Sequence, residues 1–424
     1  MSAVPTLTVR CDACGRDTPE RSFRSRCECG GLLAVHHQPV LRGAALRATF
    51  DDACCARPSR TASGVWRFGA VVQPLAMDEA VSHPEGNTPL LHRDALDAWS
   101  GIGGLLLKHE GHNPTGSFKD RGMTVAVTQA RRAGARAVAC ASTGNTSASL
   151  AAYAAQAGLT AVVFVPEGRI AVGKLSQSLA YGARTLLVDG DFDACLTLVQ
   201  EAGEELGIYL ANSINPFRVE GQKTIVLELL RQLDWQVPDW ICLPAGNLGN
   251  TAAFGKALVE ARNWGLIDRM PRLAAVQAEG ASPFAQAFAR GFDELEPVRA
   301  ETVASAIRIG APASYQRAVT AIRETDGVVL AVSDGEIIAA KAAIDAAGVG
   351  CEPASAASVA GARALRSQGT IAAGETVVTV LTGHLLKDPG IITEMHQDQR
   401  WLERPNHPLR GAATLSAVRD ALDD

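Results

Sequence analysis

Short apolar runs recur along the chain from residue 105 onward, and stretches with the apolar spacing of amphipathic helices lie between several of them. Short runs without charge are typical of strands buried on both faces of a parallel sheet. The predicted strands are Ala137–Ala141, Ala161–Val165, Thr185–Val188, Trp240–Leu243, Leu273–Val276, Val328–Val332 and Val377–Leu381. The predicted helices are Ser147–Ala157, Phe192–Leu206, Gln222–Leu233, Ala252–Ala261, Glu336–Ala347 and Ala356–Ser367. This alternation predicts an α/β fold of parallel sheets covered by helices.

Local signals refine this pattern at three places. Ser333 and Glu336 have the spacing of a capping box, so a helix is expected to begin there. The tail, residues 401–424, is expected to end in an amphipathic helix. Residues 54–86, which contain several Pro and Gly, are expected to be irregular.

Residues 1–36 form a separate polar segment with two close cysteine pairs, Cys11 with Cys14 and Cys27 with Cys29. Such pairs indicate a zinc-ribbon-like site, and four thiolates would leave no open coordination position, so the zinc would be structural. The second pair has a single intervening residue, and a reduced segment without metal is the alternative. The segment also carries five arginines, Arg10, Arg16, Arg21, Arg24 and Arg26. They leave open a role as a nucleic-acid adaptor, although such arginines more often form a solvated surface.

The composition narrows the class of protein. A chain of 424 residues with 47% hydrophobic and 20% charged residues fits a soluble α/β protein of two or three domains. A net charge of −5 does not favour nucleic-acid binding as the main activity. Residues 1–10 lack the pattern of a signal region, and no apolar run reaches the roughly 18 residues of a spanning helix. A cytoplasmic protein that does not bind membranes is therefore expected, in which Cys140 and Cys242 are buried free thiols.

Three predicted strand-to-helix turns carry unusual polar residues, and such turns bind ligands in open parallel sheets. Residues 142–147 offer hydroxyls and an amide at a helix N-terminus, which suits a carboxylate; plain N-capping is the alternative. Residues 246–251 offer glycines and successive N–H groups that can hold a phosphate; an ordinary tight turn is the alternative. Thr382, which follows the last predicted strand, could bond a heteroaromatic nitrogen or merely cap a helix.

Lys119 lies between a Gly-Ser turn and a helix that is expected to begin near Arg121. A nucleophilic lysine needs a lowered pKa, which burial or a neighbouring cation provides, and Arg121 is the candidate cation. A solvated lysine paired with Asp120 is the alternative, and for an isolated lysine it is the commoner case.

A series of motifs follows in order along the chain. The first is NPTGSFKDRG at 113–122, and after it come STGNTSAS (142–149), VPEGRIAVGKLSQSLAYGA (165–183), NSINPFRVEGQKT (212–224), PAGNLGNTAAFGK (244–256), AIRIGAP (306–312) and LTGHLLKDP (381–389). The first motif resembles the Schiff-base lysine motif of the tryptophan-synthase-β-like enzymes of fold type II, which use pyridoxal phosphate (PLP). The whole series, over roughly residues 85–390, resembles the threonine synthases within that group, and an ordered series is far more specific than one motif.

The resemblance implies a fold-type-II architecture, in which two domains have parallel-rich sheets covered by helices. Residues 37–123 and 216–424 would form a large PLP-binding domain, and residues 124–215 a smaller mobile domain, after the Cys-rich segment 1–36. Lys119 would hold the cofactor as a Schiff base and shuttle protons. Asn145 would bond the 3′-oxygen of the ring and Thr382 its pyridine nitrogen, where a hydroxyl does not enforce a protonated ring. The cofactor phosphate would be held by Gly246, Asn247, Leu248, Gly249 and Asn250.

The resemblance also implies a substrate, O-phospho-L-homoserine. Phosphate would leave by β,γ-elimination and water would add at Cβ, giving L-threonine and phosphate in a pocket that the smaller domain closes. The substrate carboxylate would be bound by Ser142, Thr143 and Thr146. Its phosphate would be bound by Lys174, Ser213, Arg218 and Lys223, among which Arg218 is the best candidate because its planar fork matches phosphate oxygens. A homodimer is expected.

Other enzymes of the same fold remain alternatives. A cysteate synthase would use O-phosphoserine and sulfite, and a basic residue at 218 would suit that substrate equally well. A serine or threonine dehydratase has no substrate phosphate to bind, which argues against it. A PLP-binding regulatory paralogue without turnover would not need Lys119, Asn145 and Thr382 together.

Overall fold

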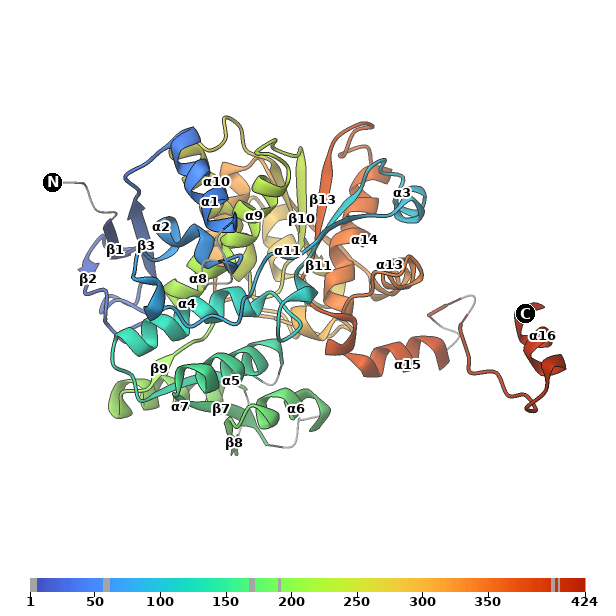
Figure 1. The fold of residues 1–424 in the computed structure, drawn as a ribbon, viewed down its shortest axis with the longest axis horizontal. Coiled ribbons are helices and arrows are strands. Elements are labelled where there is room, and N and C mark those ends of the chain that lie inside the picture. Colours follow the sequence, from blue (N-terminus) through green and yellow to red (C-terminus); the bar gives the residue numbers. More distant parts are fainter. Residues whose placement is uncertain are drawn as a thin grey trace.

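Three β-sheets organise the computed structural model, which describes residues 6–55, 62–142, 144–167, 172–189, 192–397, 401–402 and 405–423 (Figure 1). The first is a small antiparallel sheet near the N-terminus, with the strand order β2-β1-β3. Its strands are β1 (Thr6–Cys11), β2 (Asp17–Thr18) and β3 (Leu33–Gln38). The segment in which a zinc-ribbon-like site was expected is therefore built around a sheet that continues to residue 38.

A six-stranded sheet forms the centre of the molecule. Its order is β12 (Val328–Val332), β11 (Arg272–Ala278), β10 (Trp240–Pro244), β13 (Val377–Leu381), β5 (Leu106–His109) and β4 (Leu90–His92). Every pair is parallel except β4 with β5 at one edge. All five residues of β10 and of β13 are buried, as expected for strands covered on both faces.

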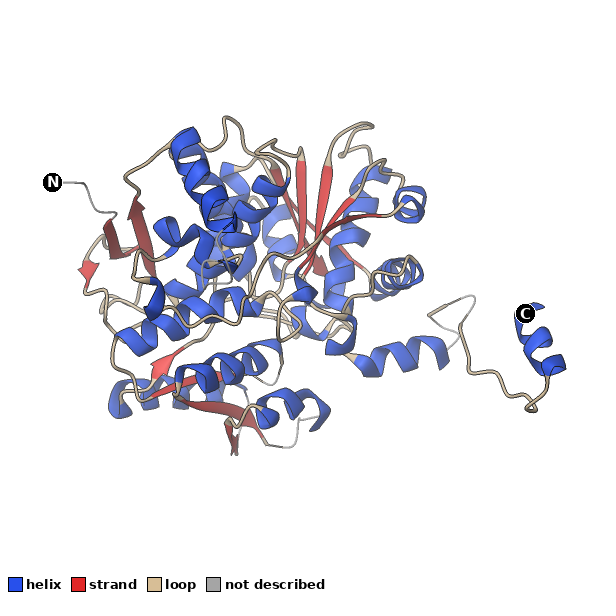
Figure 2. Cartoon of the chain, viewed as in Figure 1, coloured by secondary structure: helices blue, strands red, loops and turns tan. Residues whose placement is uncertain are grey.

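Alternate residues of these strands enter two different cores. Trp240 and Cys242 of β10 pack with α14 (Pro353–Ser367) and α13 (Asp334–Ala346) on one face. Ile241 and Leu243 point to the other face, toward α8 (Pro216–Gln222), α9 (Thr224–Gln232), α10 (Gly249–Asn263) and α12 (Tyr315–Glu324). Figure 2 shows the strands between these two layers of helices. The sheet is thus closed off from water on both faces.

A four-stranded parallel sheet lies beside the central body, with the order β8 (Arg184–Val188), β7 (Thr160–Pro166), β6 (Ala137–Ala141) and β9 (Tyr209–Leu210) (Figure 1). Val138 and Cys140 of β6 pack in one core with residues of α4 (Lys119–Arg132), α5 (Asn145–Ala157) and α6 (Val172–Ala180). Ala139 and Ala141 face α7 (Phe192–Leu206) on the other side. This sheet comes from one continuous stretch, inserted between β5 and β10.

The predicted elements compare closely with the observed ones. All seven predicted strands and all six predicted helices are present, and both reciprocal hydrogen bonds of the capping box between Ser333 and Glu336 are formed at the start of α13. The tail ends in α16 (Leu415–Asp423), as predicted. The strands β1, β2 and β3 near the N-terminus and the short strands β4, β5 and β9 were not predicted. The remaining helices are α1 (Gly43–Cys55), α2 (Gly69–Val72), α3 (Asp94–Ser100), α11 (Pro283–Ala289), α15 (Pro389–Gln397) and the short 3-10 turns η2 (Trp66–Phe68), η3 (Met77–Glu79), η4 (Glu110–His112), η5 (Glu279–Ala281), η6 (Ser305–Ile307) and η7 (Leu385–Lys387).

A buried cluster of charges ties α4 to the central sheet. The Arg121 guanidinium donates to Glu110 (Nε to Oε2, 2.6 Å) and to Glu228 (Nη2 to Oε1, 2.7 Å). Lys108 of β5 also donates to Glu228, from Nζ to Oε1 over 2.6 Å. All four side chains are at most 1% exposed. Because each charge has opposite charges as partners, the cluster can be buried, and it fixes where α4 begins.

Among the helices described, none is long and apolar enough to cross a membrane.

Candidate active site

Lys119 is the first residue of α4, and the loop before it pairs with the turn that follows β13. The Phe118 N–H donates to the Thr382 carbonyl (3.0 Å), and the His384 N–H donates to the Gly116 carbonyl (2.8 Å). Ser117 and Gly383 form an antiparallel bridge. Two motifs that lie more than two hundred residues apart in the sequence are therefore held side by side by backbone hydrogen bonds.

The surroundings of Lys119 favour a neutral amine. Burial, together with the nearby Arg218 cation, lowers the pKa of Lys119 to about 7, and the Glu352 carboxylate only partly opposes this. The expectation that Arg121 would be the neighbouring cation is wrong, because Arg121 is occupied by Glu110 and Glu228. A free amine at neutral pH is what a nucleophilic lysine requires.

Asp120 does not pair with Lys119, so the alternative of a solvated ion pair is also wrong. Its carboxylate accepts hydrogen bonds from the Thr115 N–H (2.7 Å), the Thr115 hydroxyl (2.6 Å) and the Ser149 hydroxyl (2.6 Å). Burial raises the pKa of Asp120 to about 6. Asp120 thus links the loop before Lys119 to α5.

The glycine-rich turn between β10 and α10 has its side chains already engaged. Asn247 donates to the Ser213 hydroxyl (Nδ2 to Oγ, 2.6 Å) and accepts from the Ala313 N–H (2.7 Å). Asn250 accepts from the Gln222 amide (2.7 Å). Leu248 has a φ of +62°, a left-handed conformation that is uncommon for a residue with a side chain. The backbone N–H groups of the first turn of α10 are the donors that such a turn offers to an anion.

Asn145 begins helix α5 and Thr382 follows strand β13, and both side chains contact one carboxylate. Asn145, at the start of α5, donates from Nδ2 to Oε2 of Glu352 over 3.0 Å. Thr382 donates from Oγ1 to Oε1 of the same residue over 3.3 Å, and its oxygen also lies 3.0 Å from Ser355 Oγ. The sequence reasoning missed Glu352. Its only local signal is that it directly precedes Pro353, a residue type favoured at the first position of a helix.

Arg218, on α8, is buried with part of its guanidinium unused. Nη1 donates to the Ala211 carbonyl (3.1 Å), whereas Nε and Nη2 have no hydrogen-bond partner among the described residues. Burial lowers the pKa of Arg218 to about 10, which leaves it charged at neutral pH. Unpaired donors of a buried cation are costly, so an anion that accepts from both is the natural partner.

Close packing of α8 against α4 accounts for the position of Arg218. A Cβ atom built on Gly221 would lie 1.8 Å from the carbonyl oxygen of Arg121, so only glycine permits this approach. The contact brings α8 across the first turns of α4, and Arg218 consequently acts on Lys119 electrostatically.

Of the other expected substrate ligands, the structure describes some and leaves others outside the described residues. Ser142 and Thr146 flank the start of α5 and are half-buried, and Ser142 Oγ accepts from the Gly144 N–H (3.3 Å). Ser213 bonds Asn247, as stated above. Thr143 and the side chain of Lys174 lie outside the described residues.

Lys223 belongs to a different cluster from Arg218. Its Nζ donates to Glu260 (2.7 Å) and lies 2.5 Å from a carboxylate oxygen of Glu220, and its side chain is fully buried. Glu220 in turn contacts His37 of β3 (2.6 Å). The structure therefore places Lys223 among the carboxylates of Glu220 and Glu260, which Lys256 also contacts, and does not bring it together with Arg218.

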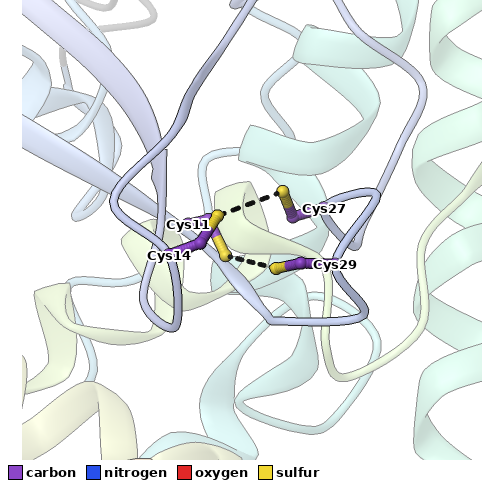
Figure 3. A group of neighbouring side chains, drawn as sticks. All are labelled: Cys11, Cys14, Cys27 and Cys29. Carbon is purple, nitrogen blue, oxygen red and sulfur yellow. Dashed lines mark hydrogen bonds between the residues drawn. The ribbon is translucent and has the colours of Figure 1, made fainter.

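The four N-terminal cysteines converge (Figure 3). Their sulfur atoms all lie within 4.8 Å of one another, with Cys11 and Cys29 3.5 Å apart and Cys14 and Cys27 3.7 Å apart. Hydrogen bonding from the Cys14 backbone, above all, lowers the pKa of Cys11 to about 7, whereas hydrogen bonds with the neighbouring thiols raise the pKa of Cys29 to about 11. Four sulfurs around one Zn²⁺, with bonds of about 2.3 Å, would be roughly 3.8 Å apart. The cluster therefore fits a tetrahedral metal site.

Known proteins resemble this chain over most of its length. The family described as "Pyridoxal-phosphate dependent enzyme" matches residues 81–383. The threonine synthase of Methanocaldococcus jannaschii is 44% identical over 90% of this chain and 93% of the relative. That of Methanosarcina acetivorans is 43% identical over 98% of both chains. The crystal structure of threonine synthase from Escherichia coli has the same fold, with a TM-score of 0.72, 20% identity and coverage of 98% and 99%. This chain belongs to the threonine synthase family of pyridoxal-phosphate-dependent enzymes.

Proposed function

We propose that this chain converts O-phospho-L-homoserine and water into L-threonine and phosphate. Relatives that align over nearly its whole length are threonine synthases. The observation that carries the proposal is Arg218: a buried guanidinium with two free donors, close enough to Lys119 to lower its pKa. A phosphorylated substrate supplies the anion that these donors lack.

The described residues fit the cofactor. Lys119 would bind PLP covalently, the N–H groups of residues 246–250 would hold its phosphate, and Asn145 and Thr382 would bond its ring. When bound, PLP delocalises the negative charge that develops on the substrate carbons. The N-terminus of α10, which the side chain of its N-cap residue does not cap, and the depressed pKa of Lys119 both suit this assignment.

Proton transfer would fall to Lys119. An amine with a pKa of about 7 can accept the Cα proton of the substrate and later return it, because both protonation states are populated at neutral pH. Ser142, Thr143 and Thr146 would orient the substrate carboxylate at the N-terminus of α5. Arg218, with Ser213 and Lys174, would hold the phosphate until it leaves Cγ, after which water adds at Cβ.

Residues 124–215 would close over the bound substrate as a mobile domain. One contact supports this proposal: Gln177 of α6 donates to the Thr115 carbonyl (3.3 Å) and accepts from Lys387 of the central domain. Thus α6 already touches the loop before Lys119.

We also propose that the protein is a homodimer, on the family resemblance alone. Light scattering of the purified protein tests this proposal.

The proposed reaction is tested by assaying phosphate and threonine together. The purified protein is saturated with PLP and given O-phospho-L-homoserine. Equimolar phosphate and threonine are expected. Binding of PLP without threonine formation, but with turnover of O-phosphoserine and sulfite, would identify a cysteate synthase instead, and failure to bind PLP would refute the assignment of the site.

Replacing Arg218 with glutamine is expected to weaken the use of phosphorylated substrate. Loss of a charge-assisted fork to phosphate should lower kcat/KM by about 10- to 100-fold. The same change removes a cation beside Lys119, so the pKa of Lys119 should rise from about 7. Steady-state kinetics measures the first effect, and the pH dependence of PLP attachment to the cofactor-free protein measures the second. Arg262→Gln, at an exposed site on α10, is the matched control, and equal kinetics in the two variants would exclude Arg218 from the phosphate site.

We propose that Cys11, Cys14, Cys27 and Cys29 bind one structural zinc ion. Their separations support this, and a four-thiolate site has no open position for catalysis. Cys14→Ser should lose most of the bound zinc and lower the melting temperature, while kcat changes by less than about twofold. Elemental analysis and thermal unfolding test this, with Arg21→Gln as a control in the same segment. Wild-type protein that binds no zinc at all would contradict the proposal.

A further inference from the structure

Glu352 lies between the start of α5 and the turn after β13, yet the proposed function gives it no role. It stands at the N-cap position of α14 without a side-chain capping bond, and its own N–H donates to the Gly383 carbonyl over 3.1 Å. The residue is 4% exposed. A Cβ atom on Gly383 would lie 2.3 Å from the Glu352 carboxyl carbon, so this carboxylate packs directly against the backbone after β13. The carboxylate therefore occupies the space that a side chain at position 383 would take, and a glycine there leaves room for it.

Both oxygens of Glu352 are used, and their partners are the two side chains expected at the cofactor ring. A carboxylate only accepts hydrogen bonds, so Asn145 must donate from its amide nitrogen and Thr382 from its hydroxyl. The 3.0 Å and 3.3 Å distances place Glu352 between them. No other described side chain is bonded to both residues.

The charged groups around Glu352 include Lys119, the proposed catalytic residue. Burial raises the pKa of Glu352, while the hydrogen bond from Asn145 and the cations Lys387 and Lys119 oppose this rise. In return, Glu352 opposes the lowering of the Lys119 pKa. The net effect is still a raised pKa, so the evidence that Glu352 acts as an acceptor is geometric: an amide N–H and a hydroxyl each lie within hydrogen-bonding distance of one of its oxygens.

We propose that Glu352 is a positioning residue that fixes which hydrogen-bonding group Asn145 and Thr382 each present to the cofactor ring. This inference rests on the proposed function, because those two residues are assigned to the ring there. Glu352 takes one N–H of the Asn145 amide and so prevents the amide from turning over, which leaves the second N–H for the ring oxygen. It takes the only proton of the Thr382 hydroxyl and so leaves that oxygen as an acceptor, which favours a protonated ring nitrogen.

Thr382 alone does not determine this direction. A hydroxyl donates or accepts equally well, and Ser355 Oγ, 3.0 Å from Thr382 Oγ1, is equally ambivalent. The carboxylate of Glu352 removes the ambiguity because it can only accept. The electron-withdrawing strength of the bound ring would thus be set by a residue that does not itself need to touch it.

Glu352→Gln tests the proposal, because it keeps the size of the side chain and removes its charge. The variant is expected to bind PLP within about fivefold of the wild-type affinity, to shift the visible cofactor absorbance and its pH midpoint, and to lose about 10- to 100-fold in kcat with less than about a threefold change in KM. Glu324→Gln, at an exposed glutamate on α12, is the control. A spectrum and kcat within about twofold of the wild type would overturn the proposal.

A second variant keeps the test decisive if Glu352→Gln does not fold. Asn145→Asp places a carboxylate against Glu352, with Lys119 and Lys387 as the nearby cations. Relative to the wild type, its affinity for PLP should improve as the pH falls, because protonating either carboxyl relieves the repulsion. A pH dependence parallel to that of the wild type would show that the two side chains do not act together. Wild-type protein that bound no PLP would instead refute the proposed function.

Discussion

Lys119→Ala is expected to reduce turnover by about 10⁴-fold or more, because it removes both the covalent attachment of the cofactor and the base that moves the Cα proton. The depressed pKa of Lys119, about 7, is the structural basis of this expectation. A lysine with an ordinary pKa would be almost fully protonated at neutral pH and a poor nucleophile. Single-turnover assays with saturating PLP measure the loss.

Lys119→Arg separates the chemistry of the amine from its charge. Arginine keeps a cation at this position but remains protonated, so the variant should be as inactive as Lys119→Ala. In the wild type, the rate of PLP attachment to cofactor-free protein should rise with pH through about 7 and then level off, since the neutral amine is the reactive form. Substantial activity in Lys119→Arg would mean that charge alone suffices and would remove Lys119 from its proposed role.

Glu228→Ala is expected to be the most destabilising single change considered. Glu228 accepts from Lys108, Arg121 and the backbone N–H groups of Asn87 and Thr88. Its removal would leave two buried cations short of a partner, which costs about 3–5 kcal/mol in the free energy of unfolding. Denaturant unfolding measures this difference. A loss below about 1 kcal/mol would show that water or rearrangement compensates the cations.

The sign of the pH dependence provides an independent check on Glu228. Its interactions with Arg121 and Lys108 outweigh the cost of burial and hold the pKa of Glu228 far below its usual range. A carboxyl with a depressed folded-state pKa stabilises above its unfolded value of about 4.3 and loses that contribution as the pH falls. The stability gap between wild type and Glu228→Ala should therefore narrow below about pH 4. Glu324→Ala, on the surface, should change stability by less than about 0.5 kcal/mol at any pH.

Local sequence patterns were sufficient to predict most elements and their order. The apolar runs at 137–141 and 377–381 became strands with the predicted bounds, and the capping box at Ser333 starts a helix. Periodicity and capping depend on residues a few positions apart, so they can be read without knowing the fold. Strands β4, β5 and β9 were not predicted because two to four residues are too few to show a period. Strands β1, β2 and β3 were not predicted because the cysteine spacing was the pattern interpreted in that segment.

Charge partnerships depended on tertiary structure. From the sequence, Arg121 was the cation nearest to Lys119, and Lys223 was a candidate phosphate ligand. The structure pairs Arg121 with Glu110 and Glu228, and Lys223 with Glu220 and Glu260. Nothing within a few residues of either position indicates these partners, because they are supplied by other strands and helices.

The sequence by itself determined the α/β class and the family. Its motifs also identified Lys119, the glycine-rich turn at 246–251 and Thr382 as candidate site residues. Only the tertiary structure decided that Arg218 is the cation beside Lys119 and that Glu352 joins Asn145 to Thr382. The physical reason is that motifs are contiguous, whereas electrostatic effects and hydrogen bonds follow distances in space. The crossing of α4 and α8 at Gly221, and the contact of Glu352 with Gly383, set those distances.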